Sequence, residues 1–123
     1  MSRPTEDDQG LFGFIASGAT VKNVGVESVD VTLDSWYYNG GALAGTNKGT
    51  ISNSYSTGSV TGLSDSQYVG GLAGYVDGGS IYNSYSTCTV DGDSFVGGLV
   101  GTLINPGSSV SKSYSNGSVT GNS

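Results

Sequence analysis

Residues 51–62 read ISNSYSTGSVTG. This stretch decides the fold because closely similar stretches occur twice more along the chain. It returns as IYNSYSTCTVDG at 81–92 and as VSKSYSNGSVTG at 110–121. A second motif, L-x-G, occurs at 11–13, 43–45, 72–74 and 99–101. Self-similarity at a fixed period indicates an array of stacked structural units. The leucines are 27 to 32 residues apart, which predicts about four such units.

A glycine pair precedes three of the four leucines, and an aromatic residue lies two positions before each pair. The pairs are Gly40-Gly41, Gly70-Gly71 and Gly97-Gly98, and the aromatic residues are Tyr38, Tyr68 and Phe95. In this alignment Ala42 is one inserted residue. The twelve-residue stretch keeps its length, whereas the segments between the motifs vary. We therefore expect a fixed core joined by loops of different lengths.

Composition and strand length together predict an all-β chain. Apolar residues make up 35% of the 123 residues and there are 22 glycines, which suits short strands joined by turns. No helical period is present. Such short strands cannot hold a sheet within one unit, but they can pair in parallel with their counterparts about 4.8 Å away. The sequence predicts a right-handed parallel β-solenoid of about four coils, the hand following the general preference of parallel crossovers. The alternative is a globular β-sandwich with accidental repetition.

Each unit is expected to contain three strands, around L-x-G, I-x-N-S-Y and S-V-x-G. Their apolar residues predict three ladders through the interior: Leu11, Leu43, Leu72 and Leu99; Val21, Ile51, Ile81 and Val110; and Val60, Val90 and Val119. Alternation within ISNSYS predicts Ile51 and Tyr55 on one face and the serines on the other.

A polar series follows each I-x pair, at Asn23, Asn53 and Asn83, and Lys112 breaks it. Asparagine tolerates the left-handed conformation of a sharp corner, and its side-chain amide can bond to its copy in the next unit. We therefore expect a left-handed corner at these positions.

The units are approximately 10–39, 40–69, 70–96 and 97–123, and residues 1–9 are expected to be disordered or a linker. The first unit is atypical, because Gly25 stands where the others have tyrosine. The chain has no recognisable cap at either end, which predicts a fragment of a longer protein. Open solenoid ends expose unpaired strand edges, so end-to-end self-association is expected.

The charge pattern excludes several partners. The net charge is −6, histidine is absent, and the cations are only Arg3, Lys22, Lys48 and Lys112. Nucleic acids and anionic membrane surfaces are bound through clustered Lys and Arg, so neither is expected. No apolar run approaches the roughly 20 residues that span a bilayer, so no membrane insertion is expected. Cys88 is the single cysteine, interpreted as a small residue at a corner rather than a reactive thiol.

Catalytic chemistry is not expected, and no cofactor is implied. A nucleophilic serine usually needs a nearby base, and the serines here lie at repeat positions. The enzyme alternative is a glycosidase with paired carboxylates, for which Asp65 and Asp93, with Asp34, are the candidates. Asp91 and Asp93 are weak calcium candidates because they are neighbouring oxygen ligands in one loop.

Two surface series are candidates for binding. Trp36, Tyr38, Tyr68 and Phe95 form one series, which would suit sugars if it faces outward, since Tyr and Trp offer a flat apolar face with a polar tip. Tyr55, Tyr85 and Tyr114 form the other, and core or corner filling is the alternative for both. Ice binding is a further alternative, based on rows at Ser59, Thr89 and Ser118 and at Thr61, Asp91 and Thr120.

The assembled pattern resembles the GLUG repeat family. The resemblance rests on GLFG at 10–13, GGLAG at 70–74 and GGLVG at 97–101. It also rests on the pattern I-x-N-S-Y-S-x-G-x-V-x-G, which is matched at 51–62 and 81–92 and more loosely at 110–121. GGALAG at 40–45 and Lys112 depart from the pattern. The resemblance covers nearly all of residues 10–121 and carries over no catalytic residue.

The family's setting implies a role for the chain. Such repeats occur in large bacterial surface proteins, including adhesin-like proteins and some proteases, where they look like stalk or binding segments. The resemblance implies a non-catalytic structural or adhesive module, extracellular or attached to the cell surface, with a glycan or protein on a host or cell surface as partner. The alternative is a carbohydrate-binding module or an accessory segment of a polysaccharide- or protein-degrading surface enzyme.

Overall fold

The computed structural model describes residues 8–33, 39–62 and 68–121. These ranges contain strands and turns and no helix. Every strand pair within them is parallel, which is how stacked solenoid coils pair. The strands form four sheets that run along the stack.

Two sheets are built from the L-x-G motif and the segment before it. The first sheet contains β1 (Asp8–Gln9), β5 (Asn39–Gly40), β9 (Tyr68–Gly70) and β14 (Val96–Gly97). The second sheet contains β2 (Phe12–Ile15), β6 (Ala44–Asn47), β10 (Ala73–Asp77) and β15 (Val100–Ile104). The sequence pattern did not predict the first sheet, because its strands are two or three residues long and lie beside glycines.

The other two sheets are built from the twelve-residue stretch. The third sheet contains β3 (Thr20–Lys22), β7 (Thr50–Ser52), β11 (Ser80–Tyr82) and β16 (Ser109–Ser111). The fourth sheet contains β4 (Gly25–Leu33), β8 (Tyr55–Gly62), β12 (Tyr85–Ser86), β13 (Thr89–Gly92), β17 (Tyr114–Ser115) and β18 (Val119–Gly121). The strands expected around I-x-N-S-Y and S-V-x-G are therefore present.

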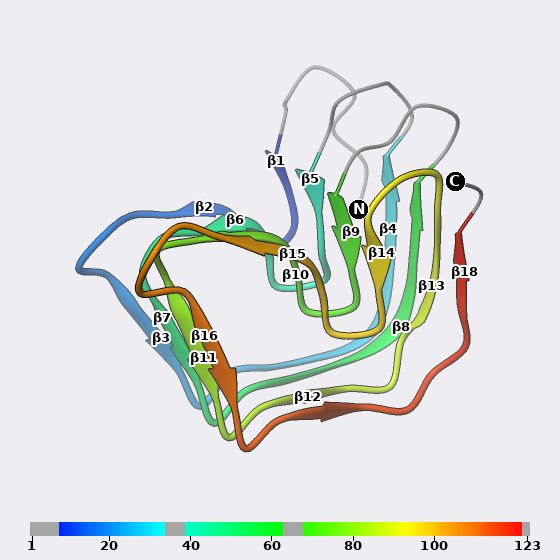
Figure 1. The fold of residues 1–123 in the computed structure, drawn as a ribbon. Coiled ribbons are helices and arrows are strands. Elements are labelled where there is room, and N and C mark those ends of the chain that lie inside the picture. The colour runs from blue at the N-terminus through cyan, green and yellow to red at the C-terminus, as the bar shows by residue number, and fades with distance from the viewer. Residues whose placement is uncertain (1–7, 34–38, 63–67, 122–123) are drawn as a thin grey trace.

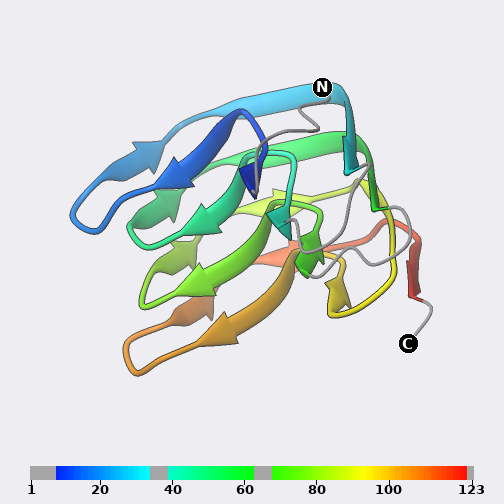
Figure 2. The same cartoon turned by 90° about the horizontal axis from the view of Figure 1, so that it is seen from above.

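Figure 1 looks along the stack, and the chain passes counterclockwise from β1 through β2 and β3 to β4. Figure 2 shows that the turns advance from the blue N-terminal end, at the back of Figure 1, to the red C-terminal end at its front. A counterclockwise path that advances toward the viewer is right-handed, as the sequence predicted. The chain returns to the first sheet at β5, β9 and β14. It therefore completes three turns and an unfinished fourth, slightly fewer than the four coils expected.

The predicted apolar ladders are in register. Ile51 pairs with Val21 and Ile81, and Ile81 pairs with Val110. Val90 pairs with Val60 and Val119, and Val31 begins the same row in the first turn. The leucine row is joined by backbone hydrogen bonds: the Leu43 amide donates to the Leu72 carbonyl at 2.9 Å, and the Leu72 amide donates to the Leu99 carbonyl at 2.8 Å.

The interior consists of two compartments. One lies between the second and third sheets and is filled by Leu43, Leu72, Ile51, Ile81 and smaller neighbours. The other lies where the first sheet faces the far end of the fourth, and contains Val31, Ala42, Val60, Val69, Cys88 and Val90. The inner members of both are fully buried. One apolar residue per turn at each position is enough to fill so narrow an interior.

The predicted face of the serines is wrong. Ser54 and Ser56 are buried, and Tyr55 points outward and is half-buried. The cause is the corner at Asn53, where φ is 49°, because one left-handed residue breaks the two-residue alternation of a strand. The left-handed corner itself is confirmed: φ is 59° at Asn23, 52° at Asn83 and 49° at Lys112.

The polar groups at this corner bond between turns through the backbone rather than through a ladder of asparagine amides. The Asn53 amide donates to the Tyr82 carbonyl at 3.2 Å, and the asparagine side chains of this series are exposed. The buried serine adds a second link. Ser84 Oγ accepts from the Ser54 amide at 3.2 Å and donates to the Tyr82 carbonyl at 3.0 Å. Each copy of N-S-Y therefore ties its corner to the neighbouring turn.

The strand register corrects the alignment of the glycine pairs. Asn39 pairs with Tyr68 and Gly40 pairs with Val69. The Ala42 amide donates to the Gly71 carbonyl, so Ala42 takes the place of the second glycine and is not an insertion. The residue in the row of Tyr68 is therefore Asn39, one position after Tyr38.

Gly70 lies where the first sheet turns into the second, and the backbones meet there without room for a side chain. A Cβ at Gly70 would overlap the Ala73 carbonyl oxygen and lie 2.8 Å from the Gly101 nitrogen. Gly41 and Gly97 face backbone atoms in the same way. These contacts are with main chain, which cannot rotate away, so only glycine fits this corner.

Replacing Gly70 with alanine should therefore destabilise the fold. We expect Gly70→Ala to lower the free energy of unfolding by about 2 kcal/mol or more, as for other overpacked sites. Urea unfolding followed by far-UV circular dichroism measures this. Gly121→Ala is the matched control, because a Cβ there would lie 3.5 Å from its nearest neighbour, an ordinary contact. Equal stability of the two variants would contradict the assigned role of the corner.

Candidate functional site

Three aromatic side chains gather where the first sheet meets the second. The Tyr68 ring centroid lies 5.1 Å from that of Phe95 and 4.7 Å from that of Tyr75. Phe95 is 55% exposed, and the two tyrosines are half-buried. Tyr68, Tyr75 and Phe95 form the aromatic cluster, which presents both ring surface and phenol groups to solvent.

The close backbone approach at the corner brings these rings together. A Cβ at Gly74 would lie 2.5 Å from the Tyr68 carbonyl oxygen, so the strand of Tyr68 runs directly against the L-x-G strand. Tyr75 follows Gly74 and projects on the outer face, beside Tyr68. Val69 pairs with Val96, which places Tyr68 and Phe95 in consecutive turns of one row. The glycines of G-G-L-x-G therefore position the cluster.

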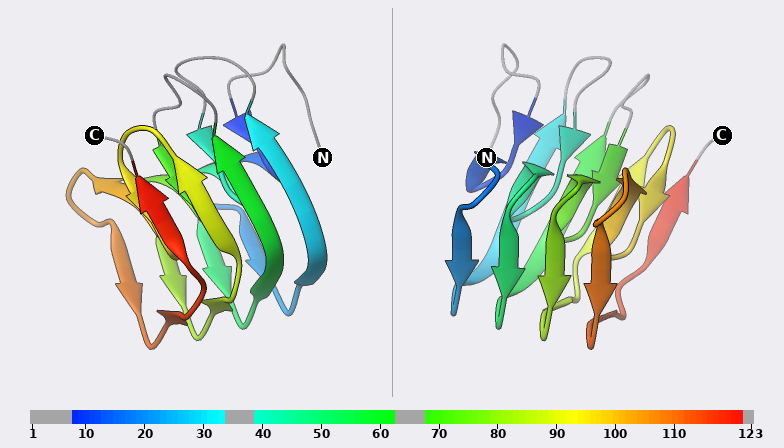
Figure 3. Two further views of the ribbon diagram at one scale, coloured as in Figure 1. Left: turned by 90° about the vertical axis from the view of Figure 1, so that its right-hand side faces the viewer. Right: turned by 60° about the vertical axis from the view of Figure 1, so that its left-hand side comes forward.

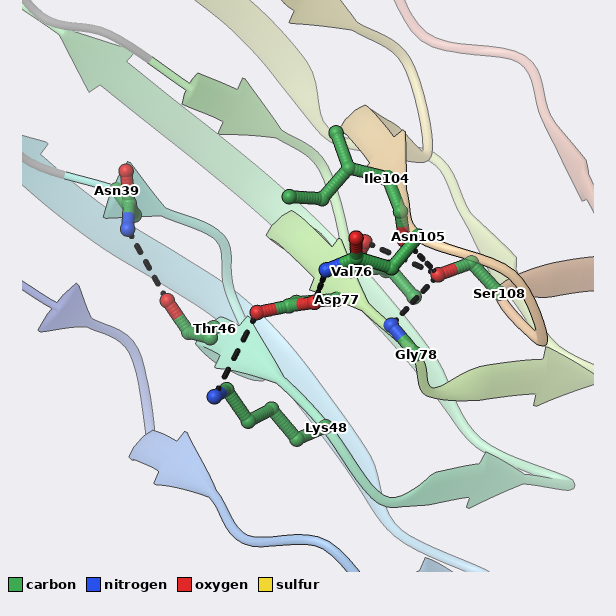
Figure 4. A network of polar contacts seen from close by, with 9 residues as sticks. All are labelled: Asn39, Thr46, Lys48, Val76, Asp77, Gly78, Ile104, Asn105 and Ser108. Carbon is green, nitrogen blue, oxygen red and sulfur yellow. Dashed lines mark hydrogen bonds and ion pairs between the residues drawn. The ribbon is translucent and has the colours of Figure 1, made fainter.

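Figure 4 shows a network of polar and charged side chains on the strands and loops of the first and second sheets. Asn39 donates from Nδ2 to Thr46 Oγ1 at 3.0 Å. Lys48 Nζ lies 3.5 Å from an Asp77 carboxylate oxygen and 5.9 Å from the centre of the Phe14 ring. Both the ion pair and the cation–π contact join side chains from consecutive turns, and at this exposure each contributes modestly.

The loops of the last two turns are joined on the same side of the molecule (Figure 4). Asn105 donates to the Asp77 carboxylate, and the Gly78 amide donates to Ser108 Oγ at 2.7 Å. Ser108 Oγ in turn donates to the Ile104 carbonyl, and the Val76 carbonyl oxygen lies 3.4 Å from it. The loops between the second and third sheets thus have defined positions although their lengths differ.

The environment of Tyr75 affects its ionisation. Burial raises the pKa of the Tyr75 phenol above its ordinary value, and the nearby Asp77 carboxylate and Tyr68 phenol add to the shift. Tyr75 is therefore a neutral hydrogen-bond donor at physiological pH. Such a group suits a neutral polar ligand such as a sugar hydroxyl.

The sequence-predicted binding residues are brought together only in part. Tyr68 and Phe95 are in contact, whereas Trp36 and Tyr38 lie outside the described residues. Tyr75 was missed. The sequence feature that could have identified Tyr75 is the aromatic residue directly after L-x-G, which also occurs at Phe14. The strand register places Phe14 and Tyr75 in one outward row.

Of the acidic candidates, Asp91 and Asp93 lie within the described residues. Asp91 lies in β13 and pairs with Thr61 and Thr120, so it interrupts that outward row. Among the described residues, no three His, Cys, Asp or Glu side chains come together as a metal site requires. Asp34 and Asp65 lie outside the described ranges, and the calcium role of Asp91 and Asp93 stays a prediction. The rows considered for ice binding are in register, with Ser59 opposite Thr89.

Cys88 is buried in the compartment between the first and fourth sheets. Its amide donates to Ser86 Oγ at 3.2 Å, and its sulfur lies 3.5 Å from Ser56 Oγ. The side chain is 1% exposed. This placement favours the interpretation of Cys88 as a small packing residue.

The second tyrosine series forms a regular stack on the outer face of the fourth sheet. The Tyr55 and Tyr85 ring centroids are 5.2 Å apart with an interplanar angle of 8°, and those of Tyr85 and Tyr114 are 5.1 Å apart at 5°. A Cβ at Gly25 would overlap the Tyr55 ring, so the glycine of the atypical first turn makes room for it. The stack is a surface feature, not core filling.

One of these tyrosines has a defined partner. The Tyr55 hydroxyl donates to Glu27 Oε2 at 2.7 Å. This hydrogen bond and the negative charge of Glu27 raise the pKa of Tyr55 above its ordinary value, with smaller effects from burial and Tyr85. The bond stabilises the neutral phenol.

One turn of the solenoid coincides with a known family motif. The family model of the GLUG motif matches residues 65–94. Residues 65–94 of this chain therefore carry the GLUG motif. The matched segment runs from before β9 to just after β13, which is one full turn of the solenoid. In this chain a GLUG motif is therefore one coil, and its G-G-L-x-G segment forms the corner under the aromatic cluster.

Other comparisons add no further relative. No curated protein matches the chain significantly. No solved structure matches it significantly either. In the ranges that the structure describes, no helix has the length and hydropathy needed to cross a membrane.

Removing the charge of Glu27 should change the titration of Tyr55. Because the folded pKa is raised, the bond to Glu27 is fully present below the ordinary pKa of about 10 and is lost as the pH rises through the folded value. We expect Glu27→Gln to lower the Tyr55 pKa toward its ordinary value. Alkaline titration of ring-labelled tyrosine by NMR measures this, and Tyr55→Phe assigns the signal. An unchanged Tyr55 titration would contradict the contact.

Proposed function

We propose that this chain is a non-catalytic structural or adhesive module of a bacterial secreted or cell-surface protein. It is a repeat module that spaces or presents neighbouring parts of such a protein. The observation that carries the proposal is that the buried serines of the repeat are occupied by contacts between turns. Ser56 Oγ, for example, donates to the Gly71 carbonyl at 2.8 Å and lies 2.9 Å from Ser86 Oγ of the next turn, within hydrogen-bond distance. These contacts support a structural role for Ser56 and Ser86.

The proposed spacing role is supported by the number of links between successive turns. Each turn is joined to the next by parallel strand pairs in four sheets. Serine hydrogen bonds at the corners and stacked tyrosines on the surface add to these pairs. A segment linked on every side bends little and sets a distance of about 4.8 Å per turn. No cofactor is needed for this role.

Spin labels can measure the rigidity that a spacer needs. Thr20 and Ser109 are exposed residues at the two ends of one row of the third sheet, three turns apart. In a Cys88→Ala background, labels on Thr20→Cys and Ser109→Cys should give one narrow distance distribution, with Cα atoms about 14 Å apart. Electron paramagnetic resonance measures it. The pair Thr50→Cys and Ser109→Cys is the control and should give a distance about one turn shorter. Broad distributions in native buffer would exclude a rigid spacer.

A second candidate function is carbohydrate binding, and the exposed aromatic cluster favours it. Tyr68, Tyr75 and Phe95 offer ring faces beside polar groups such as Thr102, a combination that sugars use. Under this proposal, the partner is a glycan on a host or cell surface. The chain would then serve as a binding or accessory segment of a surface enzyme.

Titration with a panel of soluble glycans, with and without calcium, tests this second candidate. Trp36 is the single tryptophan and reports binding through its emission. We expect one glycan class to give a saturable change, weakened roughly tenfold in Tyr75→Ala or Phe95→Ala, the scale of one aromatic contact. Tyr82→Ala, which removes an exposed ring from another sheet, is the control and should bind normally.

The outcomes of this titration separate the two functions. A calcium requirement that disappears in an Asp91→Asn, Asp93→Asn variant would identify those carboxylates as ligands. No change with any glycan, from a protein with a folded β spectrum, would exclude glycan binding for that panel and leave the structural role.

A further inference from the structure

The first turn departs from the repeat at two places in the fourth sheet. The left-hand view of Figure 3 shows this sheet from outside, with the long strands β4 and β8 side by side. Gly25 of β4 pairs with Tyr55, whereas Tyr55 pairs with another tyrosine in the turn that follows. Further along, Glu27 and Ser28 of β4 lie opposite the single residue Thr57 of β8. The valine row beyond continues in register, so the packing of the core explains neither departure.

The extra residue of β4 forms a β-bulge that aims Glu27 outward. Ser28 has a φ of 53°, in the left-handed region that residues other than glycine seldom adopt. The Ser28 amide donates to Thr57 Oγ1 at 3.0 Å, which ties this conformation to the next turn. Bulges often re-aim a side chain, and strained residues of this kind concentrate at functional sites. Glu27 is accordingly exposed.

Gly25 makes room for the partner of Glu27. A Cβ at Gly25 would overlap the Tyr55 ring, so this ring lies over the glycine and leans toward the first turn. Its hydroxyl donates to Glu27 Oε2 at 2.7 Å, the length of a charge-assisted hydrogen bond from a hydroxyl to a carboxylate. The two departures of the first turn therefore build one contact, between Tyr55 and Glu27.

The tyrosine stack holds the Tyr55 ring in this position. The Tyr55 and Tyr85 rings are within 8° of parallel, and the Tyr85 ring stacks in turn on that of Tyr114. Ring pairs in this geometry attract each other beyond the effect of the area that they bury. The stack therefore restricts the rotation of the Tyr55 ring and keeps its hydroxyl at the carboxylate.

We propose that Tyr55 is a redox-active residue that donates an electron to one-electron oxidants, with Glu27 as the acceptor of its proton. A phenol that loses an electron becomes a strong acid, so the electron leaves most easily where a base already holds the phenolic proton. A base acts directly when it lies about 2.6–3.2 Å from the atom that bears the proton. Glu27 meets this condition, because its Oε2 is 2.7 Å from the Tyr55 hydroxyl.

The step balances between the pair and the oxidant. The oxidant takes one electron from Tyr55, the phenolic O–H bond breaks, and the proton moves to Glu27 Oε2. The products are a neutral tyrosyl radical, a protonated Glu27 carboxyl group and an oxidant reduced by one electron. The Cys88 thiol does not compete for an oxidant in solvent, because that side chain is 1% exposed. The module thereby intercepts one-electron oxidants at its surface, an activity that neither a spacer nor a glycan-binding segment requires.

Flash photolysis of the intact chain with a ruthenium(III) polypyridyl oxidant tests the proposal. Transient absorption measures how fast the tyrosyl radical forms, and every variant carries Trp36→Phe, which removes the single tryptophan as a competing electron donor. We expect Glu27→Gln to slow radical formation about tenfold, because a positioned base contributes roughly a hundredfold at Tyr55 and the other tyrosines dilute this difference. A glutamine oxygen can still accept the hydrogen bond but cannot take the proton, so this variant separates proton transfer from structure.

Two further variants make the result decisive. Asp30→Asn removes one negative charge from the same strand and controls for attraction of the cationic oxidant, so it should react nearly as fast as the parent chain. In a Tyr55→Phe background, Glu27→Gln should have no further effect. Far-UV circular dichroism confirms that each variant is folded. Equal rates for the parent chain and Glu27→Gln overturn the proposal. An equal slowing by Asp30→Asn overturns it as well, since charge alone then accounts for the effect.

Discussion

Contact between backbones at the corner of the first and second sheets controls the rest of this structure. At Gly41 and Gly70 a side chain would meet main-chain atoms of the same and the neighbouring turn, and at Gly97 it would meet those of its own turn. Because the chain can bend this tightly, the strand before the glycine pair folds back against the L-x-G strand. That bend divides the interior into two compartments and gives the coil its first sheet. It also brings the aromatic residue before the pair next to the one after L-x-G.

The serines of the repeat solve a second physical problem, which is how to turn a corner without burying unpaired polar groups. An unpaired buried amide or carbonyl costs as much as a lost hydrogen bond. At the corner, Ser84 Oγ accepts the Ser54 amide and donates to a carbonyl of its own turn. Between the compartments, Ser56 satisfies the Gly71 carbonyl. With an interior only one or two side chains wide, these bonds and the parallel backbone pairs, not a large apolar core, specify the stack.

Repetition is strongest among the inward rows, although one inward row varies from Ile15 through buried Asn47 to Val76. The inward rows repeat: valine or isoleucine, valine, and serine recur from turn to turn. The outward rows differ, with Asn39 beside Tyr68 in one row and Phe14, Thr46, Tyr75 and Thr102 in another. Any binding specificity of such a module therefore resides in the outward rows. The stack of Tyr55, Tyr85 and Tyr114 is the exception, since its spacing of about 5 Å matches the rise per turn.

The sequence by itself determined the unit, its period and the apolar rows, because identical neighbours in a stack need identical residues at the same height. It also determined the left-handed corner at Asn53, since asparagine tolerates that conformation. Only the tertiary structure decided which way the serines face, because one left-handed residue shifts the alternation by an amount that a pattern cannot show. It also decided that Asn39, not Tyr38, continues the row of Tyr68, because register is set by hydrogen bonds between turns and not by spacing along one turn. The contact of Tyr75 with the aromatic cluster was likewise decided by the tertiary structure, because its neighbour Tyr68 lies across a corner of the coil. The two strands lie close together there because of glycines whose contacts exist only in the folded chain.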